Sequence, residues 1–162
     1  MSSSDLDKKY HNSLKTYEYN YHTFFPIGEP DEETIKLRFK VRAHRDAHIL
    51  LSPCMYPEEG SPVYEIVLGA GNNTYSVLRK CQQGDEQAMT ESEESLVSPD
   101  EWREYWIKIK KNKIKIGRDD EKAFLKWKDP QPIPINFYSF SSYEGAAALW
   151  IFPCFKDKDF WL

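Results

Sequence analysis

The chain has no long hydrophobic run and no hydrophobic leader. No stretch of its 162 residues approaches the roughly 20 consecutive apolar residues that a membrane-spanning helix needs, and the start, MSSSDLDKKYHNS, lacks the apolar core of a secretory signal. These two absences predict a cytoplasmic protein without a membrane span. A secreted protein whose signal had been removed would have the same sequence, so secretion stays open as the alternative.

Cysteine and histidine are scarce and are not spaced as ligands. The three cysteines, Cys54, Cys81 and Cys154, are an odd number, lie far apart and form no CxxC pair. This pattern argues against a disulfide framework and against a structural zinc site. The four histidines show neither H-x-x-x-H nor HExxH spacing. We therefore expect reduced thiols and no bound metal.

The chain also lacks a large excess of positive charge and the sequence patterns of common catalytic sites. The 26 acidic and 22 basic residues give a formal net charge of -4, which provides no general attraction to phosphate backbones, so we expect no nucleic acid partner. The chain lacks Gly-x-Ser-x-Gly, and none of its cysteines has a histidine beside it. The acidic cluster of Glu91, Glu93 and Glu94 lies in a polar segment and indicates a solvated face. We predict no catalytic residues.

Alternation of apolar and polar residues is abundant instead. Aromatic residues make up 15% of the chain, and such a composition favours strands over helices. In TIKLRFKVRA, residues 34–43, the apolar residues at 35, 37, 39 and 41 alternate with basic residues at 36, 38, 40 and 42. This period of two predicts a strand with one apolar face and one cationic face.

The same alternation, broken by turns, predicts about ten short strands. The others lie near residues 16–25, 47–52, 63–69, 74–80, 104–111, 113–117, 123–129, 135–142 and 146–155, and the acidic segment 82–98 is expected to be a solvent-facing hairpin or loop. No helical segment is available to cover a parallel sheet. We predict an all-β fold, a single antiparallel β-sandwich of jelly-roll or lectin-like type. It spans residues 16–155, between flexible tails at 1–15 and 156–162.

The stretch VYEIVLGAGNNTYSVLRK, residues 63–80, contains Gly-Ala-Gly after a predicted strand. Such a loop binds a nucleotide or S-adenosylmethionine when a helix follows it, because the N-terminal amides of that helix face the ligand. Here the segment after Gly71 is rich in β-branched and aromatic residues, and Thr74 occupies the position of the third glycine. We predict a turn between two antiparallel strands, with glycine and asparagine supplying positive φ.

Several short motifs of the chain resemble those of the farnesoic acid O-methyltransferase domain over about residues 17–154. The matching motifs are Asp46-Ala47-His48, Glu65 to Gly69, Asn-Thr-x-Ser-x-x-Arg from Asn73 to Arg79, Trp106-Ile107, and Gly145 with Trp150. The chain departs from the pattern at Ala70-Gly71, where a tryptophan usually follows the first glycine. If that aromatic lines a ligand surface in relatives, the ligand or affinity of this protein differs. The resemblance implies a β-sandwich, and the family name implies methyl transfer from S-adenosylmethionine to farnesoic acid.

Five residues near the glycine turn are candidates for ligand binding. Asp46 and His48 are close enough in sequence to converge on a ligand or, with Glu65, on a metal; the alternative is that they cap a turn and bind backbone. Glu65 and Arg79 lie at similar distances from the turn and are expected to pair across the sheet, as a structural bridge or as the polar floor of a pocket. Asn73, on the turn itself, completes the set.

The aromatic residues give two further predictions. We expect Trp106 and Trp150 in the core, and Trp127, which lies between two lysines, on the opposite face, where it can stack on a sugar or contact a partner. The chain ends with Phe160-Trp161-Leu162 behind a charged run. This apolar end is expected to dock onto the domain or onto a second copy, which makes a homo-oligomer possible.

The leading hypothesis is a non-catalytic binding or interaction module without a cofactor. Its partner would be a carbohydrate, a small apolar ligand such as a sesquiterpenoid, or a protein. The alternative, which follows from the resemblance, is an O-methyltransferase that acts on farnesoic acid with S-adenosylmethionine. A structural oligomerisation unit is the third hypothesis.

Overall fold

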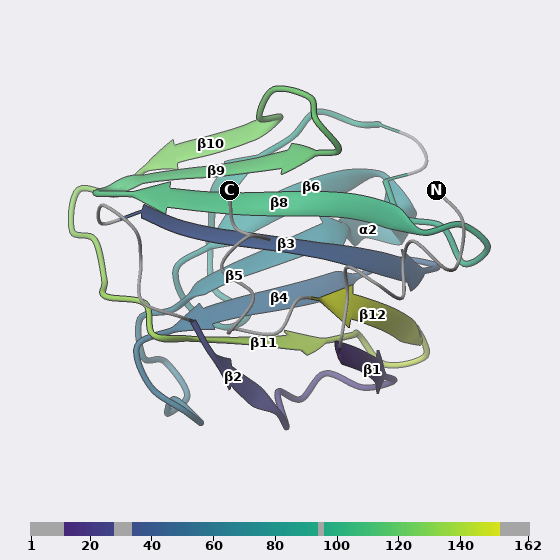
Figure 1. The fold of residues 1–162 in the computed structure, drawn as a ribbon, viewed down its shortest axis with the longest axis horizontal. Helices are drawn as coiled ribbons and strands as arrows, with labels where there is room; N and C mark the ends of the chain where they lie inside the picture. Colours follow the sequence, from purple (N-terminus) through teal and green to yellow (C-terminus); the bar gives the residue numbers. More distant parts are fainter. Residues whose placement is uncertain (1–11, 28–33, 94–95, 153–162) are drawn as a thin grey trace.

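The computed structural model of the chain describes residues 12–27, 34–93 and 96–152. These residues form twelve strands in two six-stranded antiparallel sheets that pack face to face (Figure 1). The predicted all-β sandwich is therefore confirmed. In the described residues, no helix is long and apolar enough to cross a membrane.

Sheet A has the strand order β1-β12-β3-β8-β9-β10. Its strands are β1 (Asn12–Thr16), β12 (Ala148–Phe152), β3 (Thr34–Ala43), β8 (Arg103–Lys110), β9 (Lys113–Arg118) and β10 (Leu125–Lys128). Sheet B has the order β2-β11-β4-β5-β6-β7. It contains β2 (Phe24–Pro26), β11 (Phe137–Ser141), β4 (Ala47–Ser52), β5 (Tyr64–Gly69), β6 (Tyr75–Arg79) and β7 (Glu86–Met89).

The core lies between the two sheets and is filled by the inward residues of each alternating strand. Leu37, Phe39 and Val41 of β3 are buried there, as the pattern predicted. Trp150 of sheet A stacks on Phe140 of sheet B with ring centroids 4.4 Å apart. Aromatic residues thus join the two layers, since such stacked pairs stabilise beyond the area they bury.

The glycine-rich stretch is a turn in a β-hairpin, as predicted. Strands β5 and β6 pair antiparallel on either side of it, and the turn, labelled α2 (Ala70–Asn73), is left-handed: φ is 77° at Gly69, 56° at Gly71, 60° at Asn72 and 65° at Asn73. Glycine and asparagine tolerate this region better than other residues. The chain continues into a strand, so no helix N-terminus faces the turn.

One end of the sandwich is fixed by a buried carboxylate. Asp129 accepts hydrogen bonds from the Tyr64 hydroxyl at 2.7 Å, from Lys80 Nζ at 2.9 Å and from the backbone N–H of Gln131 at 2.8 Å. Burial alone raises the pKa of Asp129, but these hydrogen bonds outweigh it and hold the pKa below its ordinary value of 3.8. The carboxylate therefore ties β5 and the residue after β6 to the segment that follows β10.

Two sequence predictions about the N-terminal part of the chain need correction. The predicted strand at 16–25 is limited to β2, because the segment from Tyr17 to Thr23 leaves the sheet. The predicted tail at 1–15 contains most of β1, which pairs with β12; its sequence, NSLKT, carries a single large apolar residue and gave no pattern to detect. The acidic segment, predicted as a solvent-facing hairpin or loop, contributes the edge strand β7, which forms a hairpin with β6. Residues 1–11 and the C-terminal segment with Phe160-Trp161-Leu162 lie outside the described residues.

Candidate functional site

The outer face of sheet B carries a polar cluster around Glu65. The fully buried Glu65 carboxylate accepts hydrogen bonds at Oε2 from the hydroxyls of Tyr19 at 2.5 Å and Tyr21 at 2.8 Å. At Oε1 it accepts from Arg79 Nη1 at 3.3 Å and from the backbone N–H of Gln83 at 3.0 Å. The predicted pairing of Glu65 with Arg79 across the sheet is confirmed. Four donors thus bind the two oxygens of the Glu65 carboxylate. Such a fully hydrogen-bonded buried carboxylate stabilises the fold.

The two tyrosines fasten the segment before β2 onto sheet B. Burial, followed by the nearby Glu65 charge, raises the pKa of both Tyr19 and Tyr21 above the ordinary value of 10.0, so both hydroxyls remain donors. Their alternation in sequence placed them on one side of the chain, but it did not indicate that this side faces a carboxylate on β5.

His48 lies beside this cluster without joining it. Its ring contacts the Tyr19 ring at a centroid distance of 5.1 Å, and its Nδ1 donates to the backbone oxygen of Asp46 at 2.8 Å. Burial lowers the pKa of His48 below its ordinary 6.5, so the ring is neutral at pH 7. The Asp46 carboxylate pairs instead with Arg45 at 2.5 Å. His48 therefore makes the backbone hydrogen bond expected under the alternative to ligand binding, whereas the Asp46 carboxylate binds Arg45 and does not cap the turn.

The remaining candidates are also engaged by the protein. Asn73 donates to the Val97 carbonyl at 2.8 Å and accepts from the Val97 N–H at 3.1 Å, which fixes the loop before β8. Trp127 packs against the core, 6.5 Å from the Tyr64 ring. In the described ranges, no group of three or more His, Cys, Asp and Glu side chains is placed to hold a metal ion.

The expected orientations of two tryptophans are wrong. Trp127 is in register with Ile114 of β9, which pairs with Ile109 of β8, so all three face the core. Trp106 is in register with Arg38 and Gly117 and faces outward. The strands that carry Trp106 and Trp127 were predicted correctly, but the side of each strand that faces the core was not. Trp150 lies in the core as expected.

A cationic region occupies the outer face of sheet A. We define the lysine surface as eight exposed lysines: Lys36, Lys108, Lys110, Lys111, Lys113, Lys115, Lys126 and Lys128. Register places four of them in one row across four strands, since Lys36 pairs with Lys108, Lys108 with Lys115, and Lys115 with Lys126. Adjacent strands lie about 4.8 Å apart, so the row spans roughly 14 Å.

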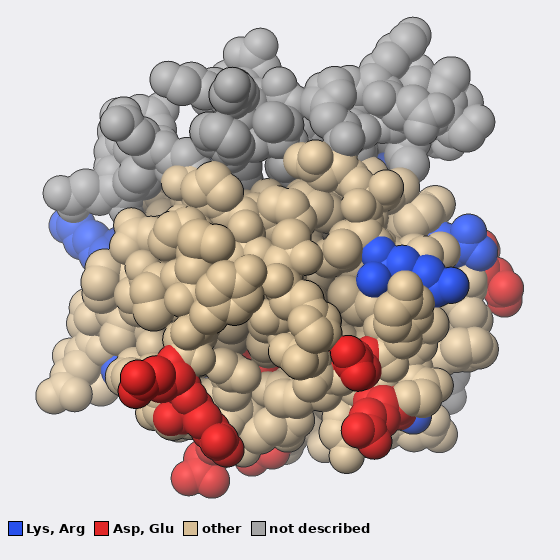
Figure 2. Space-filling view, turned by 90° about the horizontal axis from the view of Figure 1, so that it is seen from below, with Lys and Arg blue, Asp and Glu red and all other residues tan. Residues whose placement is uncertain are grey.

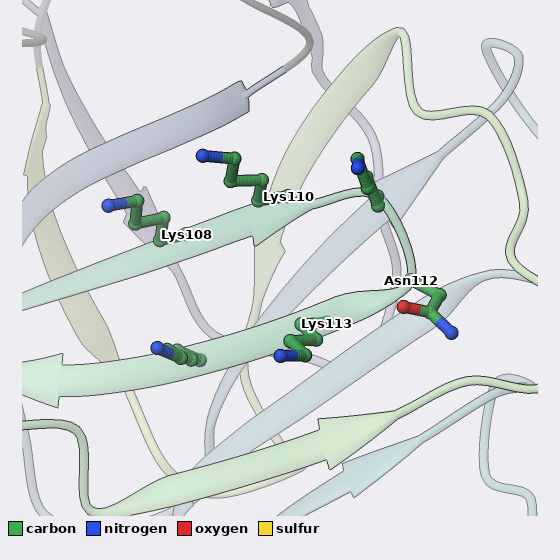
Figure 3. Close-up of a pocket in the computed structure, with 6 residues that line it drawn as sticks. Lys108, Lys110, Asn112 and Lys113 are labelled. Carbon is green, nitrogen blue, oxygen red and sulfur yellow. The ribbon is translucent and has the colours of Figure 1, made fainter.

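A second row runs parallel to the first. Lys110 pairs with Lys113, and Lys113 with Lys128. Around the β8–β9 turn the surface is hollowed into a depression of about 420 Å³, lined by five of the lysines and Asn112. Figure 3 shows Lys108 and Lys110 extending from β8, with Lys113 on the neighbouring strand.

The lysine surface has no acidic counterpart among the described residues. None of its ammonium groups forms an ion pair with a described carboxylate, whereas nearby Arg38 pairs with Glu104 at 2.9 Å. Like charges placed directly opposite in a sheet destabilise it. Acidic side chains gather elsewhere, for example along the lower part of the face seen in Figure 2. The alternation in residues 34–43 predicted one cationic face, but it did not indicate that pairing would place this face beside the lysines of β8 to β10.

Comparison with protein families identifies the chain. A family model described as farnesoic acid O-methyl transferase matches residues 15–156. The chain belongs to this family. No curated protein matches it. The glycine turn at residues 69–73 leads into a strand, so it lacks the following helix that a loop binding S-adenosylmethionine requires.

Solved structures share the fold of this family member. A Bacillus subtilis protein with a galectin-like fold matches with a TM-score of 0.58 at 13% identity, over 94% of this chain and 90% of that one. A protein from work on endo-acting O-glycanases of the human gut microbiota matches with a TM-score of 0.53 at 13% identity, over 86% and 76%. At such identities the likeness establishes the galectin-like sandwich and nothing about activity.

Proposed function

We propose that this domain is a non-catalytic binding module and that the lysine surface of sheet A holds an extended anionic ligand. The observation that carries the proposal is the register of the lysines: rows of ammonium groups face one another across four strands without an acidic partner among the described residues. An anionic ligand would relieve this repulsion on binding.

The number of charges on the lysine surface indicates how many acid groups its ligand carries. Farnesoic acid carries a single carboxylate, which neutralises one of eight ammonium groups. A polyanion that crosses the strands would meet a lysine about every 4.8 Å along each row. An extended ligand with repeated acid groups therefore complements the surface better than a sesquiterpenoid acid does. The overall charge of -4 does not oppose this, because the field near the surface depends on the local lysines.

The proposal is tested by removing two charges from the middle of the first row. Heparin, a sulfated glycan, serves as the polyanion, and the variant is Lys108→Gln/Lys115→Gln. We expect at least a tenfold loss of affinity and a shallower salt dependence, by about two in the slope of log K against log salt, since each lost contact removes about 0.9 from the slope measured on nucleic acids.

The matched control is Lys15→Gln/Lys122→Gln, which removes the same charge from exposed positions outside the lysine surface. It is expected to retain wild-type affinity within about twofold. Equal losses in the two double variants would mean non-specific attraction, and no loss in either would mean that heparin binds elsewhere or not at all. Both results contradict the proposal.

A further inference from the structure

Trp106 lies flat on the outer face of sheet A. A Cβ atom placed on Gly117, its partner on β9, would lie 2.1 Å from Cε2 and Cζ2 of the indole. The ring therefore crosses directly over the glycine backbone, with one face packed on β9 and the other directed away from the sheet. Glycine at position 117 is what permits this orientation, because any side chain would push the ring off the strand.

This half-buried ring borders the lysine surface. Trp106 precedes Lys108 by two residues on β8, and Gly117 follows Lys115 by two residues on β9. Residues two apart on a strand share a face and are separated by roughly 7 Å. The indole therefore lies beside the row that runs from Lys36 to Lys126.

We propose that Trp106 is a sugar-stacking residue and that the anionic ligand of the lysine surface is a polysaccharide. The C–H groups on one face of a pyranose ring form an apolar surface that packs on an indole, while its acid groups remain at the rim. One sugar unit rests on Trp106, and sulfate or carboxylate groups of the neighbouring units bind Lys108 and Lys115. This inference rests on the proposed function, because the lysines supply the affinity and Trp106 the recognition of a sugar.

Nucleic acid is the competing polyanion, and the surface suits it less well. Single strands are bound by several aromatic side chains on which successive bases stack, whereas Trp106 is the one aromatic side chain beside the lysine rows in the described part of sheet A. A duplex is read by a helix or a two-stranded ribbon that enters its groove. The lysine surface lies on the face of a six-stranded sheet, which does not enter a groove.

The test compares three probes on the full chain: a heparin oligosaccharide, linear polyphosphate of similar charge, and oligo(dT). The key variant is Trp106→Leu, which keeps an apolar cover over Gly117 but removes the aromatic face; Trp106→Phe is the conservative control. We expect Trp106→Leu to weaken heparin binding about tenfold, within the range known for bases stacked on aromatic side chains, and to leave polyphosphate binding within twofold. Trp106→Phe should recover most of the heparin affinity. Thermal unfolding of each variant verifies folding.

The outcomes separate this inference from the proposed function. If Trp106→Leu changes heparin and polyphosphate binding alike, or changes neither, while Lys108→Gln/Lys115→Gln still weakens both at least tenfold, Trp106 merely covers Gly117 and the inference is overturned. If the lysine variant changes neither probe, the proposed function itself is wrong. If oligo(dT) binds more tightly than heparin and depends on Trp106, the ligand is a nucleic acid and the polysaccharide assignment is overturned.

Discussion

Neutralising Glu65 is expected to destabilise the fold without affecting ligand binding. In Glu65→Gln, the Arg79 side chain, 16% exposed, keeps its charge and loses its partner, and the new amide presents a donor toward hydroxyls that already donate. Breaking a buried ion pair typically costs 3–5 kcal/mol. We expect about 3 kcal/mol, because the remaining exposure of Arg79 lets water replace part of the lost interaction. For a chain of this length, that loss lowers the Tm by about 6–12 °C.

Urea unfolding measures the loss, and Glu18→Gln is the control. Glu18 pairs with His22 at 2.9 Å, but both side chains are 61% exposed, so its loss should change the free energy of unfolding by less than about 0.5 kcal/mol. Heparin affinity should be unchanged in Glu65→Gln, because the cluster and the lysine surface lie on opposite sheets. A stable Glu65→Gln protein with weakened ligand binding would refute the structural interpretation and return Glu65 to the ligand site.

Three further predictions concern the packing of Trp106 on Gly117, the pH dependence of stability and the binding of S-adenosylmethionine. Gly117→Ala should lower the free energy of unfolding by about 1–3 kcal/mol in urea titrations, since its methyl group displaces the Trp106 ring; an unchanged midpoint would contradict the packing described. Stability should begin to fall as the pH drops below 6.5, because the unfolded chain protonates His48 there while the buried ring resists protonation. A second loss should follow below pH 3.8 from Asp129 and should be absent in Asp129→Asn; a urea midpoint that is flat from pH 7 to 3 would argue against both. Calorimetry with S-adenosylmethionine should give no saturable heat, because the turn from Gly69 to Asn73 leads into a strand; stoichiometric micromolar binding would support the methyltransferase alternative.

Local alternation was sufficient to determine most of the strands. The residues of β3 point inward and outward as their pattern requires, and the glycine turn adopts the positive φ angles that Gly69 and Asn73 permit. Both follow from interactions within a few residues of chain. The pairing of Glu65 with Arg79 also followed from sequence, because both are counted from the same turn.

The orientation of each strand toward the core, and the contacts between residues far apart in sequence, were decided by the tertiary structure alone. A strand pattern has two faces and does not state which of them is buried, so Trp106 and Trp127 were assigned to the wrong sides. The partners of Glu65 include Tyr19, 46 residues away, which no local pattern relates to it. Lys36 joins the lysine surface because β3 pairs with β8 across more than 60 residues of chain, whereas the other seven lysines lie on or beside β8, β9 and β10, which are consecutive in sequence. Sequence determined which residues carry charge; only the order and register of the strands determined that the charges meet.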